Sequence, residues 1–219
     1  MTTTNTAAHT ITVGGQPIPT RKPDMLLWLD VETTGIKPTA DLLEIGLRCT
    51  SMDGTQETAR LTGVRHLKPD EGIIFEPGAI GMHYANGLID DCLLGGLDPD
   101  DLASDVIDFT RDLAATYRLH PAGTNIQRFD LPRLASFCSR VSIAGATSLI
   151  GFLHYRAVDM TTVRALLATQ GHHLDQDHTA RHRVDDCLDR DIAFWRHAQT
   201  LITPASHTDQ ADTDSEAQA

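Results

Sequence analysis

The stretch that decides the fold is Leu26-Leu27-Trp28-Leu29-Asp30-Val31-Glu32-Thr33-Thr34-Gly35. Its apolar run predicts a buried strand that ends in two acids separated by one residue. In a strand, residues i and i+2 project to the same face, so Asp30 and Glu32 lie side by side where the strand leaves the core. Two desolvated carboxylates repel each other by roughly a few kcal/mol unless a cation neutralises them. The pair predicts a site for a hard divalent ion, Mg²⁺ or Mn²⁺, and two solvated acids before a Thr-Thr-Gly turn are the alternative.

The composition indicates one domain. The chain has 219 residues, of which 41% are hydrophobic, and this is enough for one core. No apolar run is long enough to cross a bilayer, and the start of the chain lacks the layout of a signal peptide, so no membrane contact is expected. The four cysteines form no CxxC pair, which disfavours zinc-ribbon and disulfide scaffolds and favours a reducing cytoplasm.

The net charge of −12 argues against a protein that coats long nucleic acid through a basic surface. Much of the acid is local, because eight aspartates lie between Asp90 and Asp112. Most of these aspartates lie on the solvent-exposed face of a predicted helix. A site that meets phosphate through metal ions tolerates this charge best when the substrate is short.

The order of elements predicts an α/β fold. Residues 1–22 are expected to form a flexible N-terminal arm, 23–202 the domain and 203–219 an acidic disordered tail. The predicted strands are Met25–Val31, Leu42–Leu47, Glu57–Val64, Pro121–Asn125 and Tyr155–Val158. The predicted helices are Pro77–Tyr84, Pro99–Leu119, one that starts with Asp130–Leu134, one that is capped by Asp159 and runs through Ala168, and Val184–Leu201. A meander followed by alternating helices and strands predicts a mixed central sheet flanked by helices, with ligands at the carboxyl ends of strands.

Further acids and a histidine occur where helices are predicted to begin. Asp130 stands at one helix start, and Asp185 and Asp186 stand at another. Each acid alone is explained by the helix dipole, which favours acids in the first turn. The joint set of four carboxylates and one base is Asp30, Glu32, Asp130, Asp186 and His182. It suits two-metal hydrolysis of a phosphodiester, in which ions about 4 Å apart hold the attacking and leaving oxygens and the imidazole takes a proton from water.

Three segments resemble the exonuclease motifs of the DEDDh 3′→5′ exonucleases. They are Asp30-Val31-Glu32-Thr33-Thr34-Gly35, Asn125-Ile126-Gln127-Arg128-Phe129-Asp130 and His182-Arg183-Val184-Asp185-Asp186. The resemblance runs from about Met25 to Leu201 and implies an RNase H-like fold with two divalent metal ions. It also implies that substrate is contacted by the motif residues Thr33, Gly35, Ile36 and Asn125.

Within that superfamily the chain looks most like oligoribonuclease. Two segments carry this likeness, His83-Tyr84-Ala85-Asn86-Gly87-Leu88 and His154-Tyr155-Arg156-Ala157-Val158-Asp159-Met160-Thr161-Thr162. In oligoribonucleases these segments help to bind the 5′ phosphate of very short RNA, and the Tyr-Arg segment crosses a homodimer interface. The resemblance implies a homodimer with a phosphate cap formed by His83, Tyr155, Arg156 and Thr161. Arg156 suits this role because a guanidinium binds phosphate in a fork, whereas core packing is the alternative for His83 and Tyr155.

The third motif departs from the family in its spacing. The family has four residues between the histidine and the last acid, whereas three separate His182 from Asp186. Either the loop is one residue shorter, or Arg181 stands at the histidine position. Asp185 is therefore an alternative to Asp186 as the last ligand, and His178 is the reserve candidate for the base.

Two further departures concern base stacking. Gly78-Ala79-Ile80 stands where oligoribonucleases present an aromatic wedge, and stacking is worth roughly 1–3 kcal/mol per base. Ile36 replaces the leucine that follows the first motif. The preference for dinucleotides is therefore expected to be weaker than in the family.

The sequence thus predicts a cytoplasmic 3′→5′ exoribonuclease that uses two Mg²⁺ or Mn²⁺ ions to hydrolyse short single-stranded RNA to nucleoside 5′-monophosphates. A DEDDh exonuclease that acts on single-stranded DNA in proofreading or repair is one alternative, favoured by the missing aromatic wedge. A catalytically inactive relative that binds nucleotides or a partner protein is another, favoured by the irregular third motif.

Overall fold

The structure is a computed structural model that describes residues 11–13, 16–18, 21–68, 70–141, 149–174 and 181–202. Within the expected arm, β1 (Ile11–Val13) and β2 (Gln16–Ile18) pair in a separate antiparallel sheet. The expected tail, 203–219, lies outside the described residues. The boundaries of the arm, the domain and the tail stay predictions.

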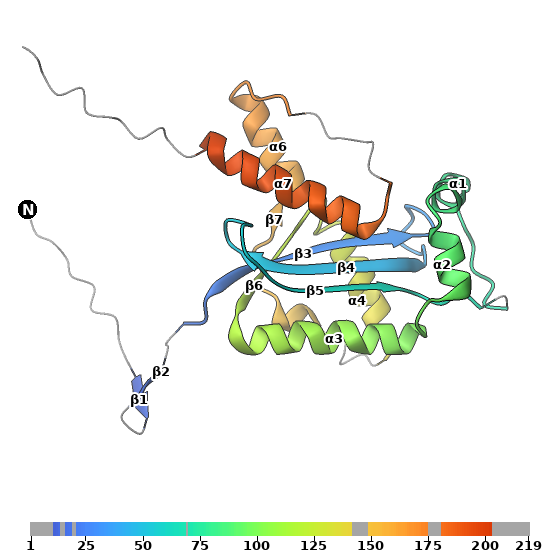
Figure 1. The fold of residues 1–219 in the computed structure, drawn as a ribbon, viewed down its shortest axis with the longest axis horizontal. Helices are drawn as coiled ribbons and strands as arrows, with labels where there is room; N and C mark the ends of the chain where they lie inside the picture. The colour runs from blue at the N-terminus through green and yellow to red at the C-terminus, as the bar shows by residue number, and fades with distance from the viewer. Residues whose placement is uncertain are drawn as a thin grey trace, which may run out of the picture.

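The main sheet has five strands in the order β5-β4-β3-β6-β7. They are β3 (Asp24–Thr33), β4 (Leu42–Ser51), β5 (Glu57–Val64), β6 (Arg118–Gly123) and β7 (Val158–Asp159). The first three form the predicted antiparallel meander, and β6 and β7 continue the sheet in parallel with β3. The predicted mixed sheet is confirmed, and the strand that carries the paired acids lies at its centre (Figure 1).

Helices cover both faces of the sheet and one of its ends (Figure 1). They are α1 (Pro77–Ala85), α2 (Leu88–Leu94), α3 (Pro99–Thr116), α4 (Asp130–Cys138), α6 (Met160–Thr169) and α7 (Val184–Ile202). Figure 1 shows α3 and α4 on one face, α6 and α7 on the other, and α1 and α2 where β3 ends. Among the described helices, none combines the length and the apolar character needed to cross a bilayer.

The alternation of side chains along β3 decides which layer the acids face. Leu27 and Leu29 belong to the core that includes residues of α3 and α4. Leu26 and Trp28 belong to the core that includes residues of α6 and α7. Because successive side chains of a strand point to opposite faces, Asp30 and Glu32 continue the second series and face α7.

One helix is shorter than its sequence pattern predicts. The helix expected to run from Pro99 to Leu119 ends at Thr116. Tyr117 adopts an extended backbone, and Leu119 is a fully buried residue of β6 that pairs with Met25. The parallel pairing with β3 overrides the helical period, which a local pattern does not reveal.

The last strand is also shorter than expected. It contains only Val158 and Asp159, so Tyr155 precedes it. The two residues pair with Ala122 and Gly123 at the end of β6, and further back Leu153 forms only an isolated bridge with Leu119.

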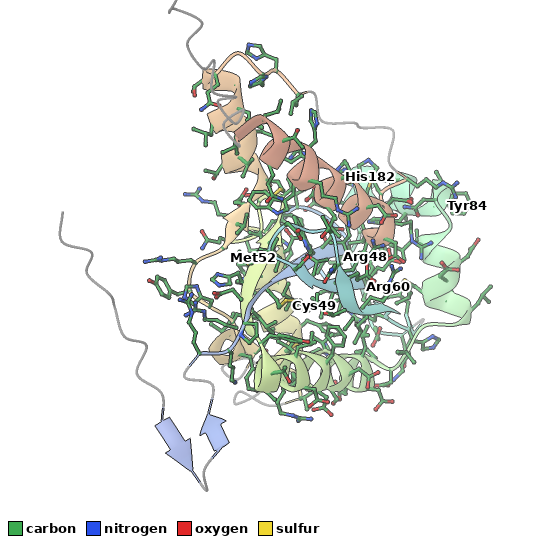
Figure 2. All side chains as sticks on the ribbon, turned by 60° about the vertical axis from the view of Figure 1, so that its left-hand side comes forward. Arg48, Cys49, Met52, Arg60, Tyr84 and His182 are labelled. Atoms are coloured by element: carbon green, nitrogen blue, oxygen red, sulfur yellow. The ribbon has the colours of Figure 1, made fainter. Side chains whose placement is uncertain are left out.

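Helix α7 approaches the sheet closely at β4. A Cβ on Gly46 would lie 2.8 Å from side-chain atoms of Val184 and Leu188, so only glycine permits this contact. The buried Arg48 anchors the same helix, because its Nη2 donates to Asp185 Oδ1 at 2.7 Å and its Nη1 donates to Asp189. Figure 2 shows Arg48 on the sheet beside α7.

Candidate active site

Three predicted carboxylates converge at the carboxyl end of β3. Asp30 and Glu32 face α7, while Asp130 lies in the first turn of α4, where its Oδ1 accepts a hydrogen bond of 3.2 Å from Val31 N–H. Glu32 and Asp130 are 8% and 3% exposed. The buried Oδ2 of Asp30 has no hydrogen-bond partner in the described part of the chain. Crowded acids with an orphaned oxygen fit a bound cation.

Burial and mutual repulsion raise the pKa values of these acids. Burial raises the pKa of Asp30 well above 3.8, and the charges of Asp130 and Glu32 add to the effect. Burial, together with the charges of Glu44 and Asp130, raises the pKa of Glu32 to about 8. Burial also raises the pKa of Asp130 to about 7, and the nearby Asp191 adds to it. A cation at this position would favour the ionised form of all three acids.

Cys187 lies where Asp186 was expected. Its Sγ and one carboxylate oxygen from each of Asp30 and Glu32 all lie within 4.8 Å of one another. Asp186 precedes Cys187 on α7, and one residue turns its side chain by about 100° around the helix axis. Burial, followed by the charges of Asp30 and Glu32, raises the pKa of the Cys187 thiol. The geometry therefore favours Cys187 over Asp186 as the group of α7 that completes the acidic cluster.

The sequence contained a signal for this residue. The spacing of the family, with four residues after the histidine, reaches Cys187 when it is counted from His182. The alternative acid, Asp185, points elsewhere, since it is paired with Arg48 and accepts a hydrogen bond of 3.3 Å from Thr62 Oγ1. Counted from His182, Cys187 therefore stands at the position that the last acid has in the family.

The predicted base, His182, stands just before α7 with a left-handed backbone, φ 52°. Asn86 Nδ2 donates to the carbonyl oxygens of Arg181 at 2.8 Å and His182 at 2.7 Å. Figure 2 shows His182 and Tyr84 of α1 on the same side of the molecule. Asn86 belongs to a segment that the resemblance singled out, but its role as a support for the base was not predicted. His178 lies outside the described residues.

Glu44 fixes the start of α7 from the sheet. Arg183 donates to both of its carboxylate oxygens, with Nε 3.0 Å from Oε2 and Nη2 2.8 Å from Oε1. The N–H of Val184 also donates to Glu44 Oε2 at 3.3 Å. Glu44 is opposite Glu32 in the register of β3 and β4. In the sequence, Glu44 could be recognised only as a single acid within an otherwise apolar strand.

His83 supports the acidic cluster from inside the protein. Its side chain is fully buried, and its Nε2 lies 2.9 Å from Thr33 O and 3.8 Å from Glu32 Oε2. Burial lowers its pKa below 6.5. The predicted contact of His83 with a 5′ phosphate does not fit this position, because the packing of α1 covers the ring. The alternative of core packing describes it.

An apolar cavity of about 390 Å³ opens beside Glu32. Its lining residues are Val31, Glu32, Thr33, Gly35, Ile36, Glu76, Gly78, Ala79, Met82 and Phe129. Ile36 is 79% exposed at this site. Gly35 lets the Glu76 side chain approach closely, because a Cβ on Gly35 would lie 2.4 Å from that side chain, which would then have to move. The hydroxyl of Thr33 donates to Gly35 O at 2.7 Å and so stabilises the turn.

Arg133 holds two walls of this cavity together. Its Nη2 donates to Ile36 O at 2.6 Å, and its guanidinium carbon lies 3.6 Å from the centre of the Phe129 ring. Arg133 was not among the predicted site residues, since a lone arginine in a helix carries no pattern. Its side chain positions the Ile36 loop against α4.

Asn125 and Thr161 lie where β6 and β7 end. The N–H groups of both residues donate to Asp159 Oδ1, at 3.3 Å and 2.8 Å. Both residues are exposed, and Asn125 has a left-handed backbone with φ 56°. Their side chains are free to face a ligand at the carboxyl edge of the sheet.

Tyr155 and Arg156 lie toward the opposite end of the strands from Asp30. Val158 is level with Trp28 through the registers of β6 with its two neighbours, and Tyr155 lies three residues further back. Tyr155 is 75% exposed, and the Arg156 guanidinium lies 5.2 Å from the centre of its ring. Tyr155 and Arg156 therefore do not lie beside Asp30 of the same chain.

The sequence of this chain is similar to those of known proteins. No model of a protein family matches the chain. Oligoribonuclease of Leifsonia xyli subsp. xyli is 24% identical over 204 residues, which cover 85% of this chain and 89% of that protein. Oligoribonuclease of Mycobacterium sp. strain KMS is 28% identical over 145 residues, which cover 65% of this chain and 63% of that protein.

Solved structures share the fold of this chain. The zinc-bound complex of E. coli exonuclease I with single-stranded DNA aligns with a TM-score of 0.65 at 15% identity, covering 83% of this chain and 41% of that chain. The complex of the same enzyme with a dT13 oligonucleotide aligns with a TM-score of 0.63 at 16% identity, covering 81% and 41%. This chain thus spans less than half of exonuclease I. It has the RNase H-like exonuclease fold, and the resemblance predicted from its motifs, to the DEDDh 3′→5′ exonucleases and among them to oligoribonuclease, is confirmed.

Proposed function

We propose that this protein is a metal-dependent 3′→5′ exonuclease that releases nucleoside 5′-monophosphates from short single-stranded RNA. The observation that carries the proposal is the convergence of Asp30, Glu32 and Asp130 around a buried carboxylate oxygen without a partner. The apolar cavity beside Glu32 supplies a place for the substrate. The relatives named oligoribonuclease support RNA as the substrate class.

The residues present fit two divalent ions, Mg²⁺ or Mn²⁺. Asp30, Glu32 and Asp130 would hold them, because carboxylate oxygens are the ligands that these ions prefer. When bound, such ions stabilise the negative charge that develops on the phosphodiester oxygens. The orphaned Asp30 Oδ2 is the observation that makes the fit specific.

The cavity beside Glu32 would bind the base at the 3′ end. Its volume of about 390 Å³ and its apolar walls suit one nucleotide rather than a long strand. Ile36 would stack against the base from the exposed side, while Arg133 keeps its loop in place. A cavity of this size would favour a chain end, and with it exonucleolytic over internal cleavage.

His182 would take the proton from the attacking water. The unperturbed pKa of an imidazole lies near neutrality, which suits a general base. Asn86 donates to the carbonyl oxygens of Arg181 and His182 and so fixes the backbone from which the imidazole of His182 projects. The attacking water would then meet the phosphorus between the base and the carboxylates.

A homodimer would complete the substrate site. Tyr155 and Arg156 are exposed and lie away from the acids of their own chain, as expected of residues that serve a partner. Light scattering tests the dimer, and a monomer at working concentration contradicts it. The cytoplasm is the proposed location, because Cys49, Cys92, Cys138 and Cys187 are all free.

Single-stranded DNA is the second candidate substrate. The solved structures with this fold are complexes of exonuclease I with DNA, including dT13. Helix α1 also presents Gly78 and Ala79, rather than an aromatic ring, to the cavity. Cleavage of RNA and DNA oligomers of matched sequence, from two nucleotides upward, decides between the two.

The deciding experiment uses Asp30→Ala. A time course with 5′-labelled oligomers in Mg²⁺, Mn²⁺ or EDTA is expected to show stepwise shortening by the wild type and none by the variant. Asp105→Ala, on the exposed face of α3, is the matched control and is expected to retain full activity. Wild-type activity in Asp30→Ala, with both variants folded by circular dichroism, contradicts the metal-site assignment.

A further inference from the structure

Cys187 differs from the other cysteines in its surroundings. Cys49 and Cys138 pack in the core beneath α3 and α4, and Cys92 packs in a third apolar cluster. Among the described residues, the group with metal-ligand geometry consists of Cys187, Asp30 and Glu32, with one ligand atom from each within 4.8 Å of the others. Cys187 thus faces two carboxylates, whereas the other three cysteines belong to apolar clusters.

The two carboxylates beside the thiol have few partners in the described structure. Asp30 Oδ2 is buried and accepts no hydrogen bond in the described structure. The Glu32 side chain is 10% exposed, and His83 Nε2, whose pKa is lowered by burial, lies 3.8 Å from Glu32 Oε2. Buried oxygens of this kind are normally satisfied, so an ion shared by all three groups accounts for both observations.

We propose that Cys187 is a metal ligand and that the centre therefore joins a thiolate to carboxylates. When the sulfur–metal bond forms, the thiol proton passes to solvent and no electron is transferred. Thiolate sulfur is a soft ligand, and Mg²⁺ takes oxygen ligands in a strict octahedral arrangement. The site consequently favours Mn²⁺, or a softer ion such as Zn²⁺ or Cd²⁺, over Mg²⁺. This selectivity deepens the proposed exonuclease function and rests on it for its effect on activity.

The first test reads the ligand without any substrate. Cd²⁺ is added to the metal-free protein, and the thiolate-to-metal absorption in the ultraviolet is followed. The band is expected in the wild type and in Cys92→Ser, and it is expected to be absent from Cys187→Ser and Cys187→Asp. Cys92→Ser is the matched control, because its hydroxyl can donate to Leu43 O as the thiol does. A band of wild-type intensity in Cys187→Ser overturns the proposal.

The second test reads the choice of metal. Cys187→Asp restores an oxygen ligand, so the ratio of the Mg²⁺-supported rate to the Mn²⁺-supported rate is expected to rise by about tenfold or more over the wild type. Cys187→Ser is expected to weaken Cd²⁺ binding by about tenfold or more in calorimetry while the melting temperature of the metal-free protein changes little. An unchanged rate ratio in Cys187→Asp, or an unchanged Cd²⁺ affinity in Cys187→Ser, overturns the proposal.

The two proposals fail in distinguishable ways. A Cd²⁺ band that requires Cys187, without hydrolysis of any oligonucleotide, supports the ligand and contradicts the exonuclease. The opposite result is hydrolysis in Mg²⁺ and Mn²⁺ that is the same in the wild type and the Cys187 variants, with no Cd²⁺ absorption band. It contradicts the role of Cys187 as a ligand and supports the exonuclease.

Discussion

The side-chain amide of Asn86 holds the backbone of His182. Its Nδ2 donates to His182 O at 2.7 Å, and the same nitrogen donates to Arg181 O at 2.8 Å. His182 has φ 52°, a left-handed conformation that costs roughly 1–2 kcal/mol in a residue with a Cβ. Asn86, the C-cap of α1, thereby links α1 to the start of α7 and determines where the imidazole stands.

Loss of the Asn86 amide is expected to reduce activity more than stability. Asn86→Asp keeps the oxygen that accepts from Leu88 N–H at 3.0 Å but loses the donor. We expect kcat on short RNA to fall by about tenfold, which corresponds to about 1.4 kcal/mol in the barrier. The free energy of unfolding, from urea titration, is expected to fall by about 1 kcal/mol. Asn86→Ala, which loses both roles, is the control and should be less stable still.

Equal activity in Asn86→Asp and the wild type would show that the hydrogen bonds to the two carbonyls do not position the base.

The strained backbone of His182 makes a second prediction. His182→Gly removes the Cβ from a left-handed residue, so the free energy of unfolding is expected to exceed that of His182→Ala by about 1 kcal/mol. Both variants are expected to lose hydrolysis, because neither carries a base. Thermal melts of the two proteins under identical conditions measure the difference. A His182→Gly variant that melts below His182→Ala would contradict the strain.

Asp185 is expected to act in structure and not in metal binding. It is paired with the buried Arg48 at 2.7 Å, away from Asp30. Asp185→Asn is therefore expected to lower the free energy of unfolding by about 1 kcal/mol, since one charge-assisted hydrogen bond weakens. The rise in melting temperature caused by Mn²⁺ should persist in Asp185→Asn and disappear in Asp30→Asn. Disappearance in both variants would identify Asp185 as a ligand.

Asp24 predicts a dependence of stability on pH. Arg118 donates to it, with Nη2 2.9 Å from Oδ2, and His120 Nε2 lies 2.8 Å from Oδ1. The hydrogen bond from Arg118, followed by that from His120, holds the pKa of Asp24 well below 3.8. A pKa lowered by folding contributes stability that is present above pH 3.8 and is lost as the pH falls toward the folded-state pKa.

Asp24→Asn is accordingly expected to melt below the wild type at neutral pH. The difference should narrow as the pH falls from 3.8 toward the folded-state pKa, because Asp24 of the unfolded protein binds a proton in this range while Asp24 of the folded protein stays ionised. Melting curves of both proteins over that range provide the measurement. A difference that stays constant at every pH would mean that the pairing of Asp24 does not contribute through its charge.

Much of the fold could be predicted because it depends on local patterns. The apolar run before Asp30 and the alternation of side chains in a strand place Asp30 and Glu32 on one face, whatever else the chain does. The cap of α6 is equally local, since Asp159 accepts from Thr161 N–H at 2.8 Å as a residue before a helix should. The boundary between α3 and β6 was missed, because the pairing of Leu119 with Met25 involves residues far apart in the chain.

The sequence by itself determined the mixed sheet, the paired acids at the end of its central strand and the resemblance to an exonuclease, because these depend on the order and period of residues. Only the tertiary structure decided which group of α7 meets those acids. That choice depends on the rotation of the helix, which is set by its contact with Gly46, by Glu44 at its start and by Arg48 on its side. A rotation of about 100° separates Asp186 from Cys187, and distant contacts of this kind leave no periodic trace in the sequence.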